Sequence, residues 1–265
     1  PATECRVANS VITHGPSNRS TTFGKVAAAA ARLTPPADVP LKDPKTWKVV
    51  GKRLARLDTV DKVTGKQIYG ADLKLPGMLN AAIKDCPVFG GKVKSFNAAA
   101  ITARPGVKKV VRVGDSAVAV IADTWWRAKT ALDALPIEWD YGTHANASSS
   151  AFAQTLKAAL DAPEAAVGNQ NGDAKAALAG AARKIEAVYS YPHQNHATME
   201  PMNATSLVTL GAGGAPERCE VWTPTQNGEA ALAAAAEAAG LPPAKCEVYK
   251  LHLGGGFGRR GTVHD

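Results

Sequence analysis

Cysteine is scarce in this sequence, and its copies are far apart. The four cysteines, Cys5, Cys86, Cys219 and Cys246, form no Cys-x-x-Cys pair. Zinc and iron–sulfur sites are usually assembled from such closely spaced thiolates, so we expect neither kind of site within this chain. Cys219 and Cys246 leave two interpretations open, a disulfide or two ordinary buried thiols, and we favour the buried thiols.

The sequence also lacks a long apolar run and a concentration of positive charge. Although 45% of its 265 residues are hydrophobic, no stretch is long enough to cross a bilayer as a helix. The net charge is +8, but the lysines and arginines are scattered, and no aromatic residues alternate with them. Nucleic-acid-binding proteins usually gather such charge on one face, so we expect no nucleic-acid partner. An anionic cofactor or partner is compatible with the charge.

The first half of the chain predicts a mixture of strands and helices. Four prolines between Thr34 and Pro44 exclude a helix or a central strand, so this stretch is expected to be a linker or an extended arm. Trp125 and Trp126 are expected in the core of the surrounding α+β module rather than in a substrate cage. The other expected elements are a short strand and a turn within 1–20, a helix at 23–33 capped by Thr21 or Thr22, a strand at 77–86, a hairpin around Gly114-Asp115, a helix at 124–135 and a strand at 136–142.

The second half begins with a polar, alanine-rich stretch and then becomes rich in strand-like segments. Residues 143–184 predict two helices, the first of which follows a run of serines. A longer helix at 228–241 is expected to stop at Gly240, ahead of two prolines. Strands are expected on both sides of this helix, at 184–192, 203–210, 219–225 and 245–253.

The most glycine-rich stretch, LHLGGGFGRRG at 251–261, follows the last expected strand. Its glycines match the G-x-G-x-x-G spacing, but a dinucleotide fold would also need a following helix and a later acidic residue. A P-loop would need Gly-Lys-Ser/Thr, which Arg259-Arg260 does not supply. An isolated glycine run favours a mobile turn. Here, however, Gly254–Gly256 can expose successive N–H groups to an anion and Arg259 adds a charged fork, so the stretch predicts a phosphorylated ligand.

Three motifs in a fixed order give the sequence a specific resemblance. They are HATMEP at 196–201, WTPTQN at 222–227 and LGGGFGRR at 253–260. In this order they resemble the molybdenum hydroxylases, the family of xanthine dehydrogenase and aldehyde oxidase. The GGGFGRR form, together with CPVFGGKV at 86–93, is most similar to the large subunits of isoquinoline 1-oxidoreductase and of related bacterial aldehyde dehydrogenases.

The resemblance implies an α+β fold, in which an α/β hammerhead domain is followed by the start of a mixed α/β molybdopterin-binding domain. Residues 1–52 resemble the tail of a preceding cofactor-domain segment with a proline-rich linker. Residues 53–143 then form the hammerhead domain, 144–184 a helical linker, and 185–265 the first part of the molybdopterin-binding domain. The family's general base is a glutamate near the far C-terminus, and no such motif is present. We therefore expect the chain to be a middle portion of a longer subunit.

The resemblance also implies a cofactor and the residues that hold it. The cofactor is molybdopterin cytosine dinucleotide with molybdenum held by its dithiolene, so no protein side chain needs to ligate the metal. Gln226 would hydrogen-bond an oxygen ligand of molybdenum, and Arg259 would contact a phosphate. Backbone amides of the glycine loop would bind the cofactor at Gly255, Gly256, Phe257 and Gly258. His196 and Glu200 are expected near the substrate funnel.

Simpler interpretations of these polar residues are open as well. Gln226 could cap the helix that begins near Asn227. His196 and Glu200, four residues apart, could form an ordinary surface pair.

The function implied by the resemblance is that of part of a catalytic subunit. Such a subunit oxidises or hydroxylates aldehydes or N-heterocycles with water as the source of oxygen. The expected partners are the remainder of the large subunit and a small subunit with two [2Fe–2S] clusters, with a cytochrome c subunit as a further candidate. The branch implies a periplasmic enzyme that is associated with the membrane through its partners. The alternatives are a non-catalytic binding or assembly fragment that holds no cofactor, and a glycine loop that binds a nicotinamide nucleotide or ATP.

Overall fold

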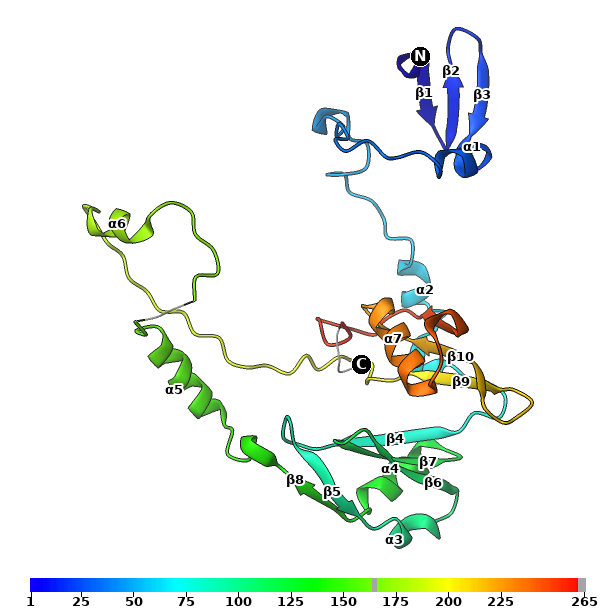
Figure 1. Cartoon of the computed structure of the whole chain (residues 1–265), viewed down its shortest axis with the longest axis vertical. Helices are drawn as coiled ribbons and strands as arrows, with labels where there is room; N and C mark the ends of the chain where they lie inside the picture. The colour runs from blue at the N-terminus through cyan, green and yellow to red at the C-terminus, as the bar shows by residue number, and fades with distance from the viewer. Residues whose placement is uncertain (164–165, 262–265) are drawn as a thin grey trace. The chain divides into compact units, whose positions relative to one another are not determined.

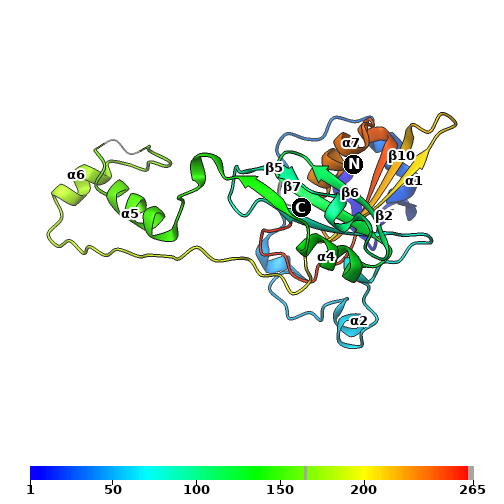
Figure 2. The same cartoon turned by 90° about the horizontal axis from the view of Figure 1, so that it is seen from below.

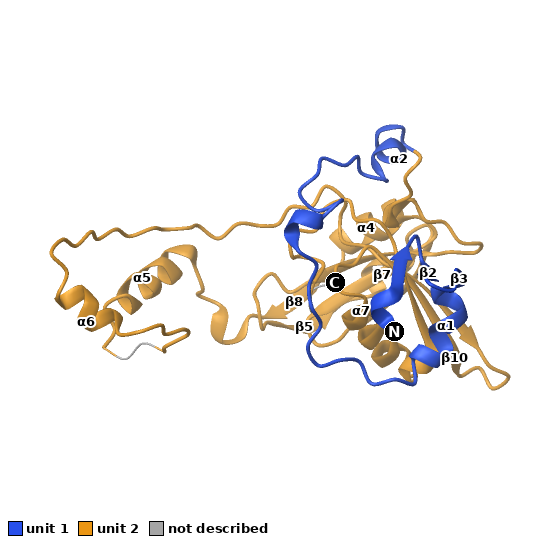
Figure 3. Ribbon diagram, turned by 90° about the horizontal axis from the view of Figure 1, so that it is seen from above, with its two compact units in different colours: residues 1–65 blue, residues 66–265 orange. Residues whose placement is uncertain are grey.

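The computed structural model describes residues 1–163 and 166–261 of the chain. The chain consists of two compact units, 1–65 and 66–265 (Figure 3). Helices and strands are both well represented, which confirms the α+β class (Figure 1). The finer boundaries expected at 52/53, 143/144 and 184/185 stay a prediction, and the last four residues of the expected 185–265 domain lie outside the described residues.

The first unit begins with a three-stranded antiparallel sheet and a helix. After a 3-10 turn at Ala2–Glu4, the sheet consists of β1 (Cys5–Ala8), β2 (Val11–His14) and β3 (Arg19–Thr22), followed by α1 (Phe23–Ala30). One strand was expected here. The turn between β1 and β2 is tight, because Asn9 and Ser10 both adopt positive φ angles, of 48° and 64°. The helix is confirmed, and the Thr22 hydroxyl caps it by accepting a hydrogen bond from the amide of Lys25 at 3.4 Å.

The remainder of the first unit contains little regular structure. No helix or strand occurs in residues 32–43, which agrees with the proline-rich composition. A 3-10 turn at Pro44–Thr46 and the short helix α2 (Thr59–Val63) follow.

The second unit opens with the expected α+β module. A 3-10 turn at Gly70–Asp72 precedes an antiparallel sheet in the order β4-β7-β6, and β5 pairs with β8 in a separate ribbon. The hairpin around Gly114-Asp115 is confirmed, because β6 and β7 flank these residues and pair with each other. The elements are β4 (Asn80–Asp85), β5 (Lys92–Phe96), α3 (Ala99–Thr102), β6 (Val107–Val113), β7 (Ala117–Ala122), α4 (Trp125–Asp133) and β8 (Ile137–Asp140).

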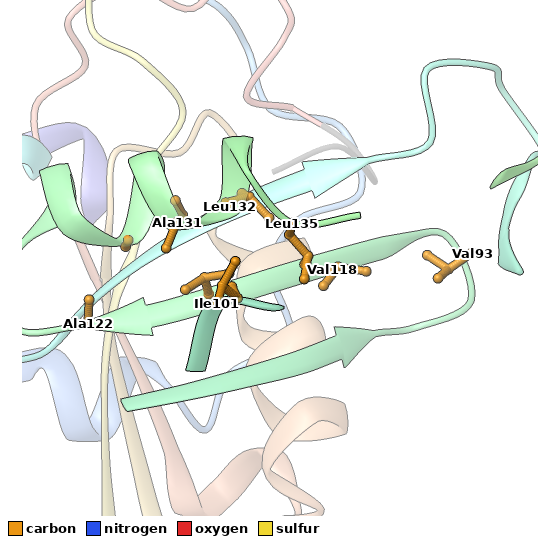
Figure 4. Packing of buried hydrophobic residues seen from close by; sticks show 10 residues of the cluster. Val93, Ile101, Val118, Ala122, Ala131, Leu132 and Leu135 are labelled. Atoms are coloured by element: carbon orange, nitrogen blue, oxygen red, sulfur yellow. The ribbon is translucent and has the colours of Figure 1, made fainter. Parts of the chain in front are cut away.

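The core of this module lies between the central strand β7 and the helix α4 (Figures 1 and 2). Val118 and Val120 of β7 are completely buried, as expected for a strand with neighbours on both sides. Leu132 and Leu135 are directed toward Val118 (Figure 4). Two alanines complete the buried stripe of α4, at Ala128 and Ala131, and their small side chains let the helix approach the sheet closely.

The placement of both tryptophans in this core was wrong. Trp125 and Trp126 are 54% and 69% exposed. The buried residues of α4 recur at spacings of three and four from Ala128 onward, so Trp126 falls on the opposite face of the helix. Trp125 is the first residue of the helix, ahead of the buried stripe.

The described residues of the range 142–204, which leave out 164 and 165, contain three short helical elements and no strand. They are a 3-10 turn at Gly142–His144, α5 (Ser149–Ala159) and α6 (Ala174–Ala179), with the Ser148 hydroxyl capping α5 as the serine run predicts. The strand expected at 184–192 is absent, which corrects the prediction. Its large apolar side chains, Ile185, Val188, Tyr189 and Tyr191, are 79–88% exposed. A strand needs a neighbour to satisfy its backbone, and no described segment pairs with this one.

The last part of the unit is a three-stranded sheet in the order β11-β10-β9. Strands β9 (Thr205–Leu210) and β10 (Pro216–Thr223) are antiparallel, whereas β10 and β11 (Cys246–Lys250) are parallel. A parallel pair needs a crossover, and α7 (Gly228–Ala239) with a 3-10 turn at Pro243–Lys245 supplies it. The helix stops at Gly240, which has a φ of 64°. These strands and this helix are confirmed.

Cys219 and Cys246 lie opposite each other on β10 and β11, and both are free thiols. Cys219 is only 3% exposed, and this burial raises the pKa of its thiol.

Candidate functional site

The three sequence motifs come together at the carboxyl ends of β10 and β11. Because these strands are parallel, the segments that leave them emerge at the same edge of the sheet. The backbone amide of Gln226 donates to the carbonyl of Arg260 at 2.7 Å, and the Thr225 hydroxyl donates to the same carbonyl at 3.1 Å. The backbone amide of Glu200, in the first motif, donates to the carbonyl of Gly254 at 3.0 Å.

Gln226 uses one end of its carboxamide to hold the glycine loop. Its Oε1 accepts a hydrogen bond from the amide of Gly258 at 3.0 Å. Within residues 1–163 and 166–261 the Nε2 group has no hydrogen-bond partner, and the side chain is exposed. The interpretation of Gln226 as a helix cap was wrong. Asn227, whose shorter side chain accepts from the amide of Ala230 at 3.2 Å, is the N-cap residue of α7.

The glycine loop has an unusual backbone. Gly255, Phe257 and Gly258 have φ angles of 109°, 56° and 94°, and the Phe257 side chain is 75% exposed. The amide of Gly254 donates to Glu200 Oε2 at 3.0 Å. By contrast, the next three amides, of Gly255, Gly256 and Phe257, have no hydrogen-bond partner in the described part of the chain. Consecutive amides of this kind form an anion-binding concavity.

Two of the glycines are required by close packing against the other motifs. A Cβ atom at Gly254 would lie 2.4 Å from the Cβ atom of Glu200. A Cβ atom at Gly256 would lie 2.7 Å from Oε1 of Gln226. Any larger residue at these two positions would push the loop away from the residues that hold it.

Beneath the loop lies a buried ion pair between Arg260 and Glu200. The Nη2 atom of Arg260 is 3.3 Å from Oε2 of Glu200, and the two side chains are 1% and 6% exposed. The guanidinium also donates to the carbonyls of Gly255, Pro224 and Glu200 at 2.9, 3.3 and 2.7 Å. This pair was not recognised from the sequence. The only sequence signal was that two motifs interpreted as ligand-binding also contain residues of opposite charge. These are Glu200 in HATMEP and Arg260 in LGGGFGRR.

The remaining residues of the expected site have mixed outcomes. The interpretation of His196 and Glu200 as a surface pair was wrong, because Glu200 is 8% exposed and is paired with Arg260. His196 is exposed, and its Nε2 atom lies 3.9 Å from where a Cβ atom of Gly258 would be. The funnel role of both residues stays a prediction, although the burial of Glu200 gives it a clear structural role. Arg259 is half-buried and its guanidinium has no partner among the described residues, so its phosphate contact also stays a prediction.

The donor set suits an anionic group that brings its own metal ligands. In the described ranges, no three His, Cys, Asp or Glu side chains lie close enough together to hold a metal ion. The site instead presents three unpartnered backbone amides, a carboxamide NH₂ and the nearby Arg259, all of which donate hydrogen bonds. In the same ranges, no helix is both long and apolar enough to span a membrane.

Comparisons with known proteins bear on this site. A profile of the molybdopterin cofactor-binding domain matches residues 160–264. A nicotinate dehydrogenase chain of Pseudomonas putida, one of that enzyme's subunits, is 28% identical over 84% of this chain and 19% of its own length. The beta chain of isoquinoline 1-oxidoreductase from Brevundimonas diminuta is 26% identical over 98% of this chain and 38% of its own length. The chain thus spans less than two fifths of the length of each of these two relatives.

A solved structure supports the fold. Quinoline 2-oxidoreductase of Pseudomonas putida 86 superposes with a TM-score of 0.58 and 20% sequence identity, over 80% of this chain and 31% of the other. The arrangement of strands and helices is therefore shared with that enzyme.

Proposed function

We propose that this chain is part of the large subunit of a molybdenum hydroxylase, and that residues 196–260 form one wall of a molybdopterin-cofactor site. The whole enzyme would oxidise aldehydes or N-heterocycles with water as the source of oxygen. The observation that carries the proposal is the row of three unpartnered amides at Gly255, Gly256 and Phe257, next to the free carboxamide NH₂ of Gln226.

The residues of the wall fit the cofactor by hydrogen-bond donation. The bound cofactor supplies the redox centre of the reaction. The loop amides would hold anionic oxygens of the cofactor, and Arg259 would neutralise a phosphate. Gln226 would donate from Nε2 to an oxygen bound to the metal, since its Oε1 is already committed to Gly258. Donors that are fixed in advance need no reorganisation when the ligand binds.

The cofactor's nucleotide and the partners form the finer part of the proposal. The molybdopterin carries a cytosine dinucleotide, and electrons leave through a small subunit with two [2Fe–2S] clusters, with a cytochrome c subunit as a further partner. The enzyme is periplasmic and is associated with the membrane through these partners. Support comes from the resemblance of GGGFGRR and CPVFGGKV to the isoquinoline branch, and from the naming of both relatives above as subunits.

Elemental and kinetic measurements on the intact complex test the proposal. The complete large subunit is purified with the polypeptides that accompany it, and its molybdenum content is measured beside its turnover of an aldehyde and of isoquinoline. We expect molybdenum to be present in proportion to the active fraction. A fully active preparation without molybdenum would overturn the proposal. Molybdenum-free, inactive protein that still binds its partners would favour an assembly fragment.

A further inference from the structure

Glu200 and Arg260 are the only charged residues that are buried in the described part of the chain. Burying a charged side chain is unfavourable unless it is paired and fully hydrogen-bonded. Both conditions are met here. The carboxylate of Glu200 accepts from the amide of Gly254 at 3.0 Å, the amide of Ala71 at 3.2 Å and Nδ2 of Asn203 at 3.1 Å. The pair therefore has a defined geometry that links three separate segments.

The partners of this pair include the carbonyls that control the direction of the free amides. In a trans peptide, the C=O of one residue and the N–H of the next point in opposite directions. The carbonyl of Gly254 is held by the backbone amide of Glu200, so the N–H of Gly255 points away from Glu200. The carbonyl of Gly255 is held by Nε of Arg260 at 2.9 Å, so the N–H of Gly256 points away from the guanidinium.

The third peptide follows the same rule within the loop itself. The carbonyl of Gly256 accepts from the amide of Arg259 at 2.9 Å, so the N–H of Phe257 points away from that amide. The direction of each unpartnered amide is thus set by the hydrogen bond that the carbonyl of the same peptide group accepts. Two of these three anchors come from Glu200 and Arg260.

We propose that Arg260 and Glu200 are positioning residues, which fix the peptide planes of the glycine loop so that three consecutive N–H groups converge on an anionic ligand. The nature of that ligand rests on the proposed function, whereas the aiming of the amides does not. Arg260 suits this task because its planar fork reaches the carbonyls of Gly255, Pro224 and Glu200 at once. A lysine in its place would keep the charge but could not hold all three.

The test compares Arg260→Lys with a matched surface substitution, Arg218→Lys, in the complete large subunit within its complex. The side chain of Arg218 is exposed and bonds only to Glu220 among the described residues. Two quantities are measured. One is amide hydrogen exchange at Gly254 and Gly258, the two loop amides that are hydrogen-bonded, compared with residues 118–120 of the core strand. The other is the rate at which molybdenum is lost during dialysis. Outer partners of a bound metal centre typically change its retention by about 10- to 100-fold.

We expect Arg260→Lys to speed exchange at these two loop amides, with no change in the core strand, and to speed molybdenum loss by at least about tenfold. Arg218→Lys should change neither quantity. Wild-type exchange in the loop of the Arg260→Lys variant would overturn the inference, whatever the molybdenum content. If the wild-type complex contains no molybdenum but the loop still loosens, the proposed function fails and the positioning role stands.

A second variant covers the case in which Arg260→Lys does not assemble. Glu200→Gln keeps the size of the side chain and the backbone amide that anchors Gly254, but removes the charge that pairs with Arg260. It should produce a smaller increase of exchange at the same amides. Unchanged exchange in this variant would overturn the role of the Glu200 carboxylate.

Discussion

The Oε1 atom of Gln226 accepts the amide hydrogen of Gly258 at 3.0 Å, so the orientation of this carboxamide is fixed by the glycine loop. One side chain therefore joins the end of β10 to the loop after β11 and still has an NH₂ group to offer.

Replacing Gln226 separates its two hydrogen-bonding roles. Gln226→Glu keeps an oxygen that can accept from Gly258 but removes the NH₂ donor, whereas Gln226→Ala removes both. Loss of one preorganised donor at a reacting centre costs about 10²- to 10³-fold in kcat. We expect both variants of the intact enzyme to lose at least about 10²-fold in kcat under steady-state turnover. Wild-type kcat in Gln226→Glu would show that the NH₂ group has no catalytic role.

Gly256→Ala should displace the loop, because the added Cβ atom would lie 2.7 Å from Oε1 of Gln226. The matched control is Gly213→Ala, where a Cβ atom would meet nothing within 4 Å. We expect Gly256→Ala to lower the molybdenum content of the purified complex and Gly213→Ala to leave it unchanged. Equal molybdenum contents in the two variants would contradict the close packing described here.

The core of the α+β module predicts a stability difference along one helix. Leu132 is 3% exposed, whereas Lys129 is on the exposed side of α4 and pairs with Asp133. Leu132→Ala should lower the free energy of unfolding by about 2–5 kcal/mol through the cavity that it leaves. Lys129→Ala should change it by no more than about 0.5 kcal/mol, the usual value for a pair four residues apart on a helix. Denaturant unfolding of the complete subunit measures both, and similar losses would contradict the core assignment.

Cys219 should react with iodoacetamide more slowly than an ordinary thiol and with a shifted pH dependence. Its pKa is raised by burial, so the reactive thiolate forms at higher pH than in an ordinary thiol of pKa about 8.5. The alkylation rate should therefore keep rising above pH 9. Peptide mass spectrometry follows the modification, with urea-unfolded protein as the control. A rate that levels off near pH 8.5 in the folded protein would contradict the raised pKa.

Local signals in the sequence predict most of the regular structure. Gly114-Asp115 marks a hairpin, Thr22 and Ser148 mark helix starts, and Gly240 marks a helix end, because each feature depends on residues within a few positions. The prediction of a strand at 184–192 was wrong for the opposite reason. Its alternating apolar residues favour extended backbone, but a strand also requires a neighbour from a distant part of a chain.

The sequence predicts the segments that form the site but not the hydrogen bonds and the ion pair that connect them. The motifs identify Gln226 and the glycine loop, and the parallel strands β10 and β11 bring them together as expected of such a pair. Arg260 was missed because nothing in its sequence neighbourhood distinguishes it from Arg259. Only the folded chain shows that one of these adjacent arginines is 1% exposed while the other is half-buried.

The contacts of Arg260 also bear on how this wall tolerates change during evolution. Its hydrogen bonds go to the carbonyls of Pro224, Gly255, Glu200 and Pro201, and a carbonyl is present whatever residue occupies a position. Side chains around the loop can therefore diverge without removing the acceptors on which the loop depends. The framework that presents the amides therefore depends on the path of the backbone more than on the side chains that surround it.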